Sequence, residues 1–278
     1  MRAFFALAAL AFMTLAPSFA SAAESRLESL DTPVAGTDKT YLDLARAFVP
    51  DLAADGMSWK GSTLDVDLAE RFDLDEDWPD GLAISGVETV TFERAAKKEL
   101  AVLFDFGLSN GVPQAPAILA LYQLEKEPRL VGSLNVGLDR ETSFAEPPIL
   151  DLGGGANVLI TRSSHWNSNQ SYLITSLMLA TEDDLEPIDT VMTFSERLCG
   201  LSRTQEPAIS VDSSGTRPAL RVAVDIREEK VEGGCDSEPA PGPARTVTAT
   251  YRLNEKTGRY EPDSDALDAL ARKNMERF

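Results

Sequence analysis

From Val87 onward, the chain is a series of β-rich runs separated by turn residues, and this pattern constrains the fold more than any other feature. The runs form three similar sets that begin with VTFERAAKKELAVLFDFG, ILDLGGGANVLITRSS and ISVDSSGTRPALRVAVDI. A second strand and a shorter third one follow in each set. Placing Leu100, Val158 and Leu220 at equivalent positions gives spacings of 58 and 62 residues. The sequence therefore predicts a mainly β fold, an antiparallel meander of three roughly 60-residue repeats.

The strand pattern also indicates how the predicted repeats pack. LALYQLE and YLITSLML mix polar and apolar residues with a period near two, which is typical of antiparallel strands that bury one face. Such a meander has to cover its apolar face with a second sheet or with neighbouring units. A propeller-like array and a sandwich are both compatible with this requirement.

A helix is predicted near each terminus. Thr40 is placed to cap YLDLARAFV, with Asp43 completing a capping box, and Ser264 is placed to cap DALDALARKNMERF. The predicted organisation is therefore a helix and acidic linker region over residues 23–86, followed by a repeated β domain with a C-terminal helix over residues 87–278.

The first 22 residues have the pattern of a signal peptide. Arg2 precedes an apolar run from Ala3 to Leu15, and Ala20 and Ala22 form an A-x-A cleavage site. The run is shorter than the roughly 20 residues that a membrane-spanning helix needs, and no later stretch is comparable. We expect a soluble periplasmic or secreted protein without a transmembrane anchor.

The charge of the chain limits its partners. Its 45 acidic and 26 basic residues give a net charge of −19, which becomes −20 when the segment carrying Arg2 is removed. Such a surface repels phosphate backbones, so a nucleic-acid partner is not expected. A protein or glycan ligand is compatible with this composition, and the ligand can be cationic. High solubility alone also accounts for the charge.

Cys199 and Cys235 are the two cysteines of the chain. In an exported protein such a pair is predicted to form a disulfide, here closing a loop of about 37 residues. Two thiols and one histidine are too few ligands for a structural zinc site.

GLSNG at residues 107–111 matches the G-x-S-x-G pattern of serine hydrolases. Ser109, then Asp151 (or Asp139), then His165 follow the chain order of a Ser-acid-His triad. However, Pro113 and Pro116 oppose the helix that a nucleophile elbow requires. A serine hydrolase that uses Ser109, Asp151 and His165 is therefore the alternative hypothesis, and a glycine-rich hairpin loop is favoured over it.

The segment RSSHWNSNQS contains His165, the single histidine of the chain. Trp166, Asn167 and Asn169 combine an aromatic ring with amide groups, a composition suited to contacts with sugars or protein surfaces. We predict that these three residues bind a ligand. The leading hypothesis is a non-enzymatic binding or envelope-interaction module.

FDLDEDWPDG at residues 72–81 gathers carboxylates. Asp73, Asp75 and Asp77 imitate the start of a calcium-binding loop, but Trp78 and Ile84 occupy the positions of the required glycine and glutamate. A solvated acidic loop is favoured, no cofactor is expected, and calcium at these aspartates is the alternative.

Overall fold

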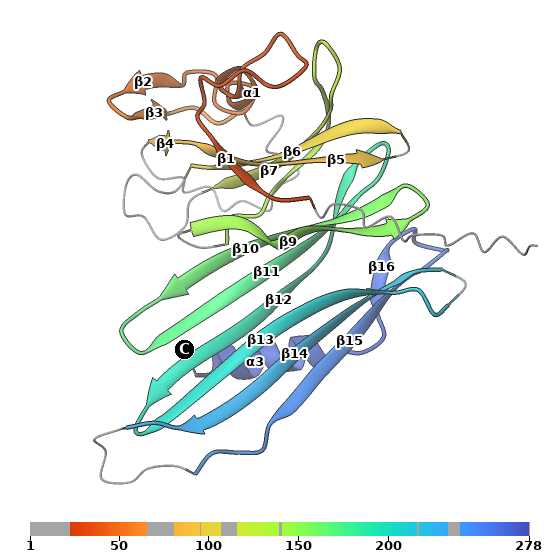
Figure 1. The fold of residues 1–278 in the computed structure, drawn as a ribbon. Helices are drawn as coiled ribbons and strands as arrows, with labels where there is room; N and C mark the ends of the chain where they lie inside the picture. Colours follow the sequence, from red (N-terminus) through yellow and green to blue (C-terminus); the bar gives the residue numbers. More distant parts are fainter. Residues whose placement is uncertain are drawn as a thin grey trace, which may run out of the picture.

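The computed structural model describes residues 23–65, 81–94, 96–106, 116–138, 141–215, 217–232 and 240–277. The chain is mainly antiparallel β with one helix near each terminus (Figure 1), which confirms the predicted fold class. Among the described residues, no helix has the length and apolar character needed to cross a membrane.

The strands of the described residues form three sheets. The five-stranded sheet contains β1 (Arg26–Glu28), β5 (Val87–Arg94), β6 (Lys97–Asp105), β7 (Ala117–Gln123) and β8 (Arg129–Asn135). The eight-stranded sheet contains β9 (Glu141–Gly153), β10 (Ala156–Trp166), β11 (Gln170–Ala180), β12 (Leu185–Leu198), β13 (Leu201–Asp212), β14 (Ala219–Lys230), β15 (Arg245–Leu253) and β16 (Tyr260–Pro262). A small sheet contains β2 (Ala53–Asp55), β3 (Ser58–Gly61) and β4 (Leu82–Ile84).

Most strands belong to three consecutive four-stranded meanders. These are β5 to β8, β9 to β12 and β13 to β16, and within each meander sequence neighbours pair side by side. Leu100, Val158 and Leu220, which the sequence aligns, lie on the second strand of their respective meanders. The meander pattern is thus present in the structure, and the repeat relationship itself stays a prediction.

The five-stranded sheet is a central layer that is covered on both faces. Leu100, Val102 and Phe104 of β6 pack in a cluster with α1 (Tyr41–Ala45) and the segment after it. The alternate residues Ala101 and Leu103 pack against β9 to β11. Because both faces are buried, β6 and β7 read as continuous apolar runs rather than alternating ones. Figure 1 shows α1 and the long strands on opposite sides of this layer.

Helix α1 begins as predicted. The Thr40 amide donates to Asp43 Oδ2 (2.8 Å), and the Asp43 amide donates to Thr40 Oγ1 (3.2 Å), which completes the capping box. The regular helix ends at Ala45, four residues before the predicted end, and Phe48 and Val49 enter the core from the following turn. This core cluster extends from Leu30 to Tyr122 and so includes residues on both sides of residue 86.

The eight-stranded sheet opens between β12 and β13. These strands share three residue pairs at their common hairpin, ending at Glu196 and Arg203. Beyond this point, the Phe194 amide donates to the side-chain oxygen of Gln205 (3.1 Å). Helix α3 (Ala266–Met275) contacts β12 and β15, and its Leu267 and Leu270 join the core of the long sheet.

Two buried amide side chains satisfy the polar groups at the opening. Gln205 Nε2 donates to Asn274 Oδ1 (2.8 Å), and Asn274 Nδ2 donates to the Met192 carbonyl (3.2 Å). The backbone of β12 is therefore hydrogen-bonded where β13 no longer reaches it. The N-cap of α3 is Asp265 rather than the predicted Ser264, and its side chain makes no capping hydrogen bond.

Replacing Asn274 with leucine tests this connection. Asn274→Leu leaves the Met192 carbonyl and the Gln205 amide without their partners, so we expect the free energy of unfolding to fall by about 2–4 kcal/mol. Met275→Leu, at the exposed neighbouring position, is the matched control and should change it by less than about 0.5 kcal/mol. Equal denaturation midpoints for the two variants would contradict this role of Asn274.

Candidate functional site

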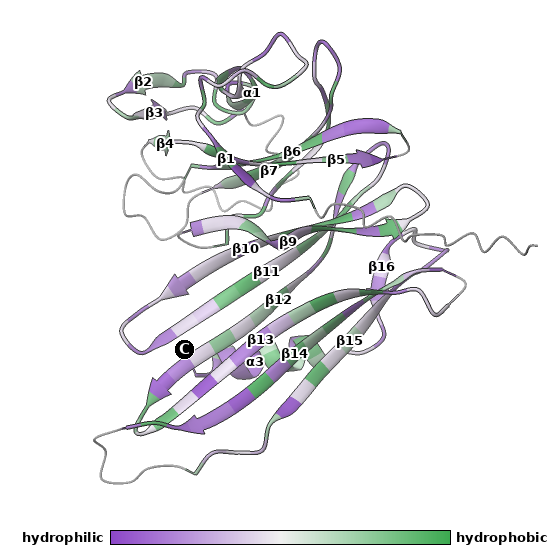
Figure 2. Cartoon of the chain, in the orientation of Figure 1, coloured by the Kyte–Doolittle hydropathy of each residue, from purple (hydrophilic) through white to green (hydrophobic). Residues whose placement is uncertain are grey.

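An open depression lies where the β10–β11 turn meets the β12–β13 hairpin. It has a volume of about 310 Å³. We call it the Trp166 depression. Its lining is polar except for one indole ring, and consists of Trp166, Asn167, Ser168, Asn169, Gln170, Ser171, Ser195, Glu196, Arg197, Ser202, Arg203 and Thr204. In Figure 2, β12, β13 and β14 become hydrophilic at one end of the sheet, and this end carries the β12–β13 hairpin.

Strand register builds the floor of the depression. Trp166 is paired with Ser171, and Ser171 is paired with Ser195, so these three side chains share one face of the sheet. Arg197, two residues beyond Ser195, is paired with Ser202 on the same face. Trp166 is 51% exposed. The floor thus presents one accessible aromatic ring beside a row of hydroxyl groups.

His165 faces the other side of the sheet. Successive residues of a strand point to opposite faces, so His165 and Trp166 are separated by the sheet. The imidazole ring stacks on its cross-strand neighbour Tyr172, with centroids 5.2 Å apart and planes inclined by 10°. The histidine therefore lies outside the lining of the Trp166 depression.

Hydrogen bonds fix the turn that forms one wall. Asn167 Oδ1 accepts from the amides of Asn169 (3.2 Å) and Gln170 (3.0 Å). The Arg197 amide donates to the Asn169 carbonyl (2.8 Å), and Gln170 Nε2 donates to the Arg277 carbonyl (3.2 Å). These contacts connect the turn to β12 and to the residues after α3. Two of the three predicted binding residues thus build the wall through their amide groups and backbone.

A network of ion pairs supports the hairpin. Glu196 is 6% exposed and pairs with both Arg203 and Arg277. Arg203 also pairs with Glu228, which accepts a hydrogen bond from the Gly242 amide (2.7 Å). That amide, together with Arg203, lowers the pKa of Glu228 below its usual range. The charged carboxylate is the form that the fold stabilises.

Replacing Glu228 tests the contribution of this charge. The pKa of Glu228 is lower in the folded chain than in the unfolded chain. The ionised carboxylate therefore stabilises the fold at pH values above its pKa in the unfolded chain, and this stabilisation is lost as the pH falls through its pKa in the folded chain. Glu228→Gln should therefore destabilise the protein by about 1–2 kcal/mol at neutral pH. The difference from the wild type should shrink as the pH falls from about 5 to about 3.

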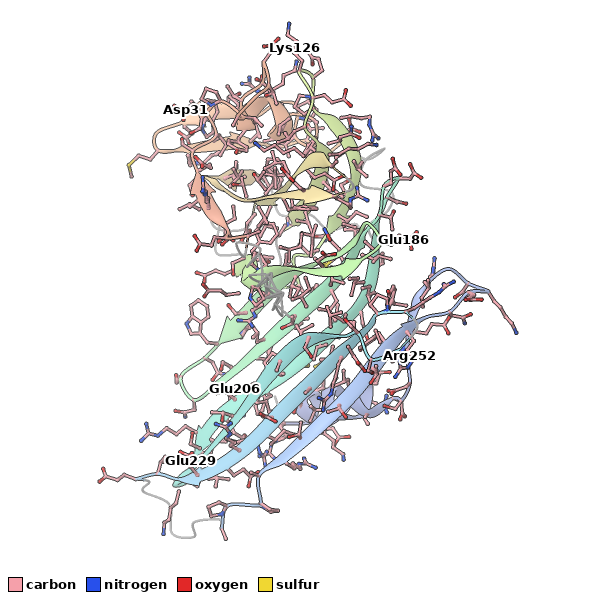
Figure 3. The ribbon with its side chains drawn as sticks, turned by 45° about the vertical axis from the view of Figure 1, so that its right-hand side comes forward. Asp31, Lys126, Glu186, Glu206, Glu229 and Arg252 are labelled. Carbon is pink, nitrogen blue, oxygen red and sulfur yellow. The ribbon has the colours of Figure 1, made fainter. Side chains whose placement is uncertain are left out.

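The control is Glu229→Gln, at the exposed neighbouring position near the end of the hairpin (Figure 3). It should change thermal stability little at any pH in this range. A difference for Glu228→Gln that is unchanged at acidic pH would show that the carboxylate charge is not what stabilises the fold.

The structure separates two residues of the alternative triad. Asp151 is paired with Asn157 near the start of β10, and its side chain accepts from the Gly153 amide (2.7 Å). His165 lies eight residues farther along the same strand, about 26 Å away at the usual rise of a strand. Asp151 therefore does not contact His165. Ser109 and Asp139 lie outside the described residues.

Two more predictions involve residues outside the described part of the chain. Asp73, Asp75 and Asp77, the candidate calcium ligands, belong to the undescribed segment 66–80. Within the described ranges, no group of three or more His, Cys, Asp or Glu side chains is arranged to hold a metal ion. Cys199 lies in the β12–β13 turn, whereas Cys235 lies in the undescribed segment 233–239.

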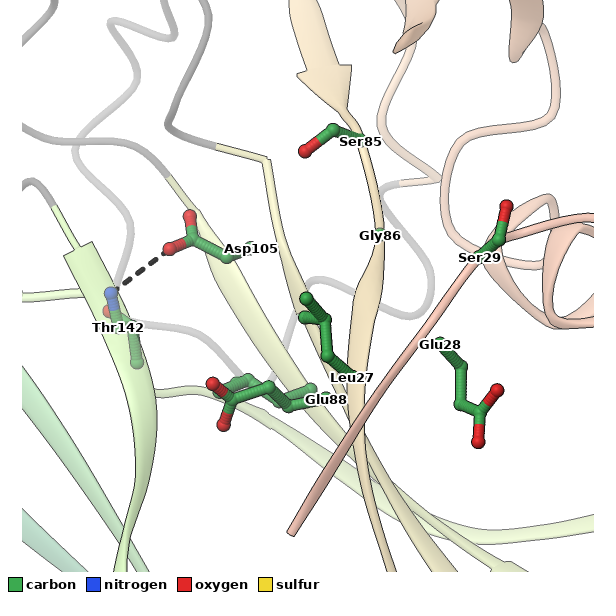
Figure 4. Close-up of a pocket in the computed structure, with 9 residues that line it drawn as sticks. Leu27, Glu28, Ser29, Ser85, Gly86, Glu88, Asp105 and Thr142 are labelled. Atoms are coloured by element: carbon green, nitrogen blue, oxygen red, sulfur yellow. Dashed lines mark hydrogen bonds between the residues drawn. The ribbon is translucent and has the colours of Figure 1, made fainter. Parts of the chain in front are cut away.

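A second hollow, of about 320 Å³, lies between the five-stranded sheet and β9 (Figure 4). Two of its three described carboxylates already bind backbone amides. Asp105 accepts from the Thr142 amide (3.0 Å), and Glu88 accepts from the Phe144 amide (2.7 Å). In Figure 4, Asp105 points toward Thr142 and Glu28 is turned away from this contact. These carboxylates attach β9 to the central sheet, so the fold accounts for their positions.

A third hollow, of about 940 Å³, lies between β5 and the β9–β10 turn. Its charged lining contains both signs, with Arg26 and Lys98 among the cations and Glu93 and Asp151 among the carboxylates. Phe92, its aromatic lining residue within the described ranges, is 8% exposed and belongs to the core. The Trp166 depression differs from it by offering an exposed aromatic surface to a ligand.

Comparison with protein-family models, with curated proteins and with solved structures finds no match to this chain. Sequence reasoning predicted Trp166, Asn167 and Asn169, but it missed Ser195, Ser202 and Thr204. These hydroxyl residues join the site through strand register, and their local sequences carry no signal of it.

Proposed function

We propose that this protein is an exported, non-enzymatic binding module whose ligand occupies the Trp166 depression. The observation that carries the proposal is the half-exposed indole ring above a fixed polar floor. Exposed tryptophan next to hydrogen-bonding groups is typical of contact surfaces, because the ring supplies area at a low cost in conformational entropy. The signal-peptide pattern of the first 22 residues supports action in the periplasm or outside the cell.

Solvent access to Trp166 tests the proposal. The chain has three tryptophans, so a Trp59→Phe/Trp78→Phe variant leaves Trp166 as the single emitter. Acrylamide should quench the fluorescence of Trp166. Envelope polysaccharide, envelope protein and lipid vesicles are then added in turn, and one of these three should reduce the quenching. If none of the three protects Trp166 in the folded mature chain, the depression is not a ligand site.

Salt dependence tests whether a cationic partner binds through the net charge. A basic protein held by the acidic surface should bind more weakly as ionic strength rises, because salt screens exposed charges. We expect the ligand that protects Trp166 to bind with little dependence on salt, since Glu196, the carboxylate that lines the depression, is buried and paired.

The mature protein should begin at Ala23 and contain one disulfide between Cys199 and Cys235. The Val231 amide donates to the Gly200 carbonyl (2.8 Å), which brings the chain beside the Cys199 turn four residues before Cys235. Intact mass and peptide mapping of exported protein, with and without reductant, measure both properties. A retained N-terminal segment or two free thiols would contradict the exported state.

A further inference from the structure

The hydroxyl groups of the depression are unused by the fold. Ser171, Ser195, Ser202 and Thr204 come from three neighbouring strands. Within the described part of the chain, none of their side chains makes a hydrogen bond, whereas the amide of Asn167 and the guanidinium of Arg203 are engaged. A hydroxyl both donates and accepts. The floor is therefore equipped for a ligand that offers donors and acceptors together.

The local charge of the depression differs from that of the whole chain. Glu196 is its one carboxylate among the described lining residues, and Arg203 and Arg277 neutralise it below the surface. Arg197 is exposed at the rim and has no ion pair within the described residues. A cationic ligand would therefore find no unpaired carboxylate among the described lining residues, and the exposed Glu229 is the cross-strand partner of Ser202.

The length of the floor and the order of its side chains limit which ligand can bind. Trp166 and Ser202 lie on strands separated by two others, so about 14 Å of floor extends between them at the usual strand spacing. The indole ring lies at one end of this floor and hydroxyls lie along it. A wholly apolar partner would remove water from these hydroxyls without offering them hydrogen bonds, which is unfavourable.

We infer that the Trp166 depression binds a neutral saccharide chain, an inference that rests on the proposed function. One sugar ring would lie with its C–H face on the indole, where aromatic rings make favourable contacts with weakly polar C–H groups. The following sugar units would exchange hydrogen bonds with Ser171, Ser195 and Thr204. The hydrogen-bonded turn at Asn167 keeps the site in its binding form, so little ordering is needed when a ligand arrives.

A microarray of uncharged oligosaccharides, probed with the folded mature chain, identifies the ligand, and calorimetry then gives its affinity. We expect Trp166→Ala to weaken binding at least tenfold and Trp166→Tyr to retain part of it. Ser171→Ala/Ser195→Ala should weaken binding by about 5- to 100-fold, from two lost hydrogen bonds. Ser210→Ala, on the exposed part of β13, and Met57→Ala, on the β2–β3 turn, are controls and should bind as the wild type does.

Binding that is unchanged between low and high salt, and that is lost with Trp166, supports the inference. No bound oligosaccharide, or binding that persists in Trp166→Ala, overturns it. If polylysine or another protein protects Trp166 from quenching while saccharides do not, the binding function stands and the saccharide inference fails. If no ligand protects Trp166, the proposed function itself fails.

Discussion

The early end of the β12–β13 ladder is the constraint on which much of this structure depends. After three residue pairs the two strands separate, and a β-sheet that opens in this way exposes backbone groups that must find other partners. The side chains of Gln205 and Asn274 provide them. This requirement gives the C-terminal helix its position, because a helix elsewhere could not bring Asn274 to the Met192 carbonyl. The final meander is thereby attached to the second one by polar side chains as well as by its apolar core.

The same hairpin forms the candidate site. Arg197 and Ser202 pair within it, and Ser195 is in register with Trp166 through Ser171. Ion pairs of the buried Glu196 support the hairpin. The residues after α3 contact both the hairpin and the β10–β11 turn, since the Arg277 guanidinium pairs with Glu196 and the Arg277 carbonyl accepts a hydrogen bond from Gln170 Nε2. The candidate binding surface is thus held in place by the same contacts that hold the fold. This fits a module that recognises a ligand without a large conformational change.

The periodicity of the sequence was sufficient to predict the fold class, the capped first helix and the strands of the three meanders. Alternation and turn residues are local signals, and they were readable at Leu100, Val158 and Leu220. The burial of β6 on both faces was not predicted, because a continuous apolar run does not identify its two covering layers. The hydroxyl floor could not be predicted either, since Ser195 and Ser202 share a face with Trp166 only through the register of four strands. His165 attracted attention as the single histidine, yet strand alternation places it on the face opposite Trp166.

The proposed ligand recognition is confined to one depression on the long sheet. The most direct measurement is an amide and indole NMR titration of the mature chain with the oligosaccharide that binds best. We expect the shifted resonances to belong to Trp166, to the 167–170 turn and to the floor hydroxyl residues, with β1 to β5 unaffected. Shifts centred on the hollow between β5 and the β9–β10 turn, with an unchanged Trp166 indole signal, would contradict it.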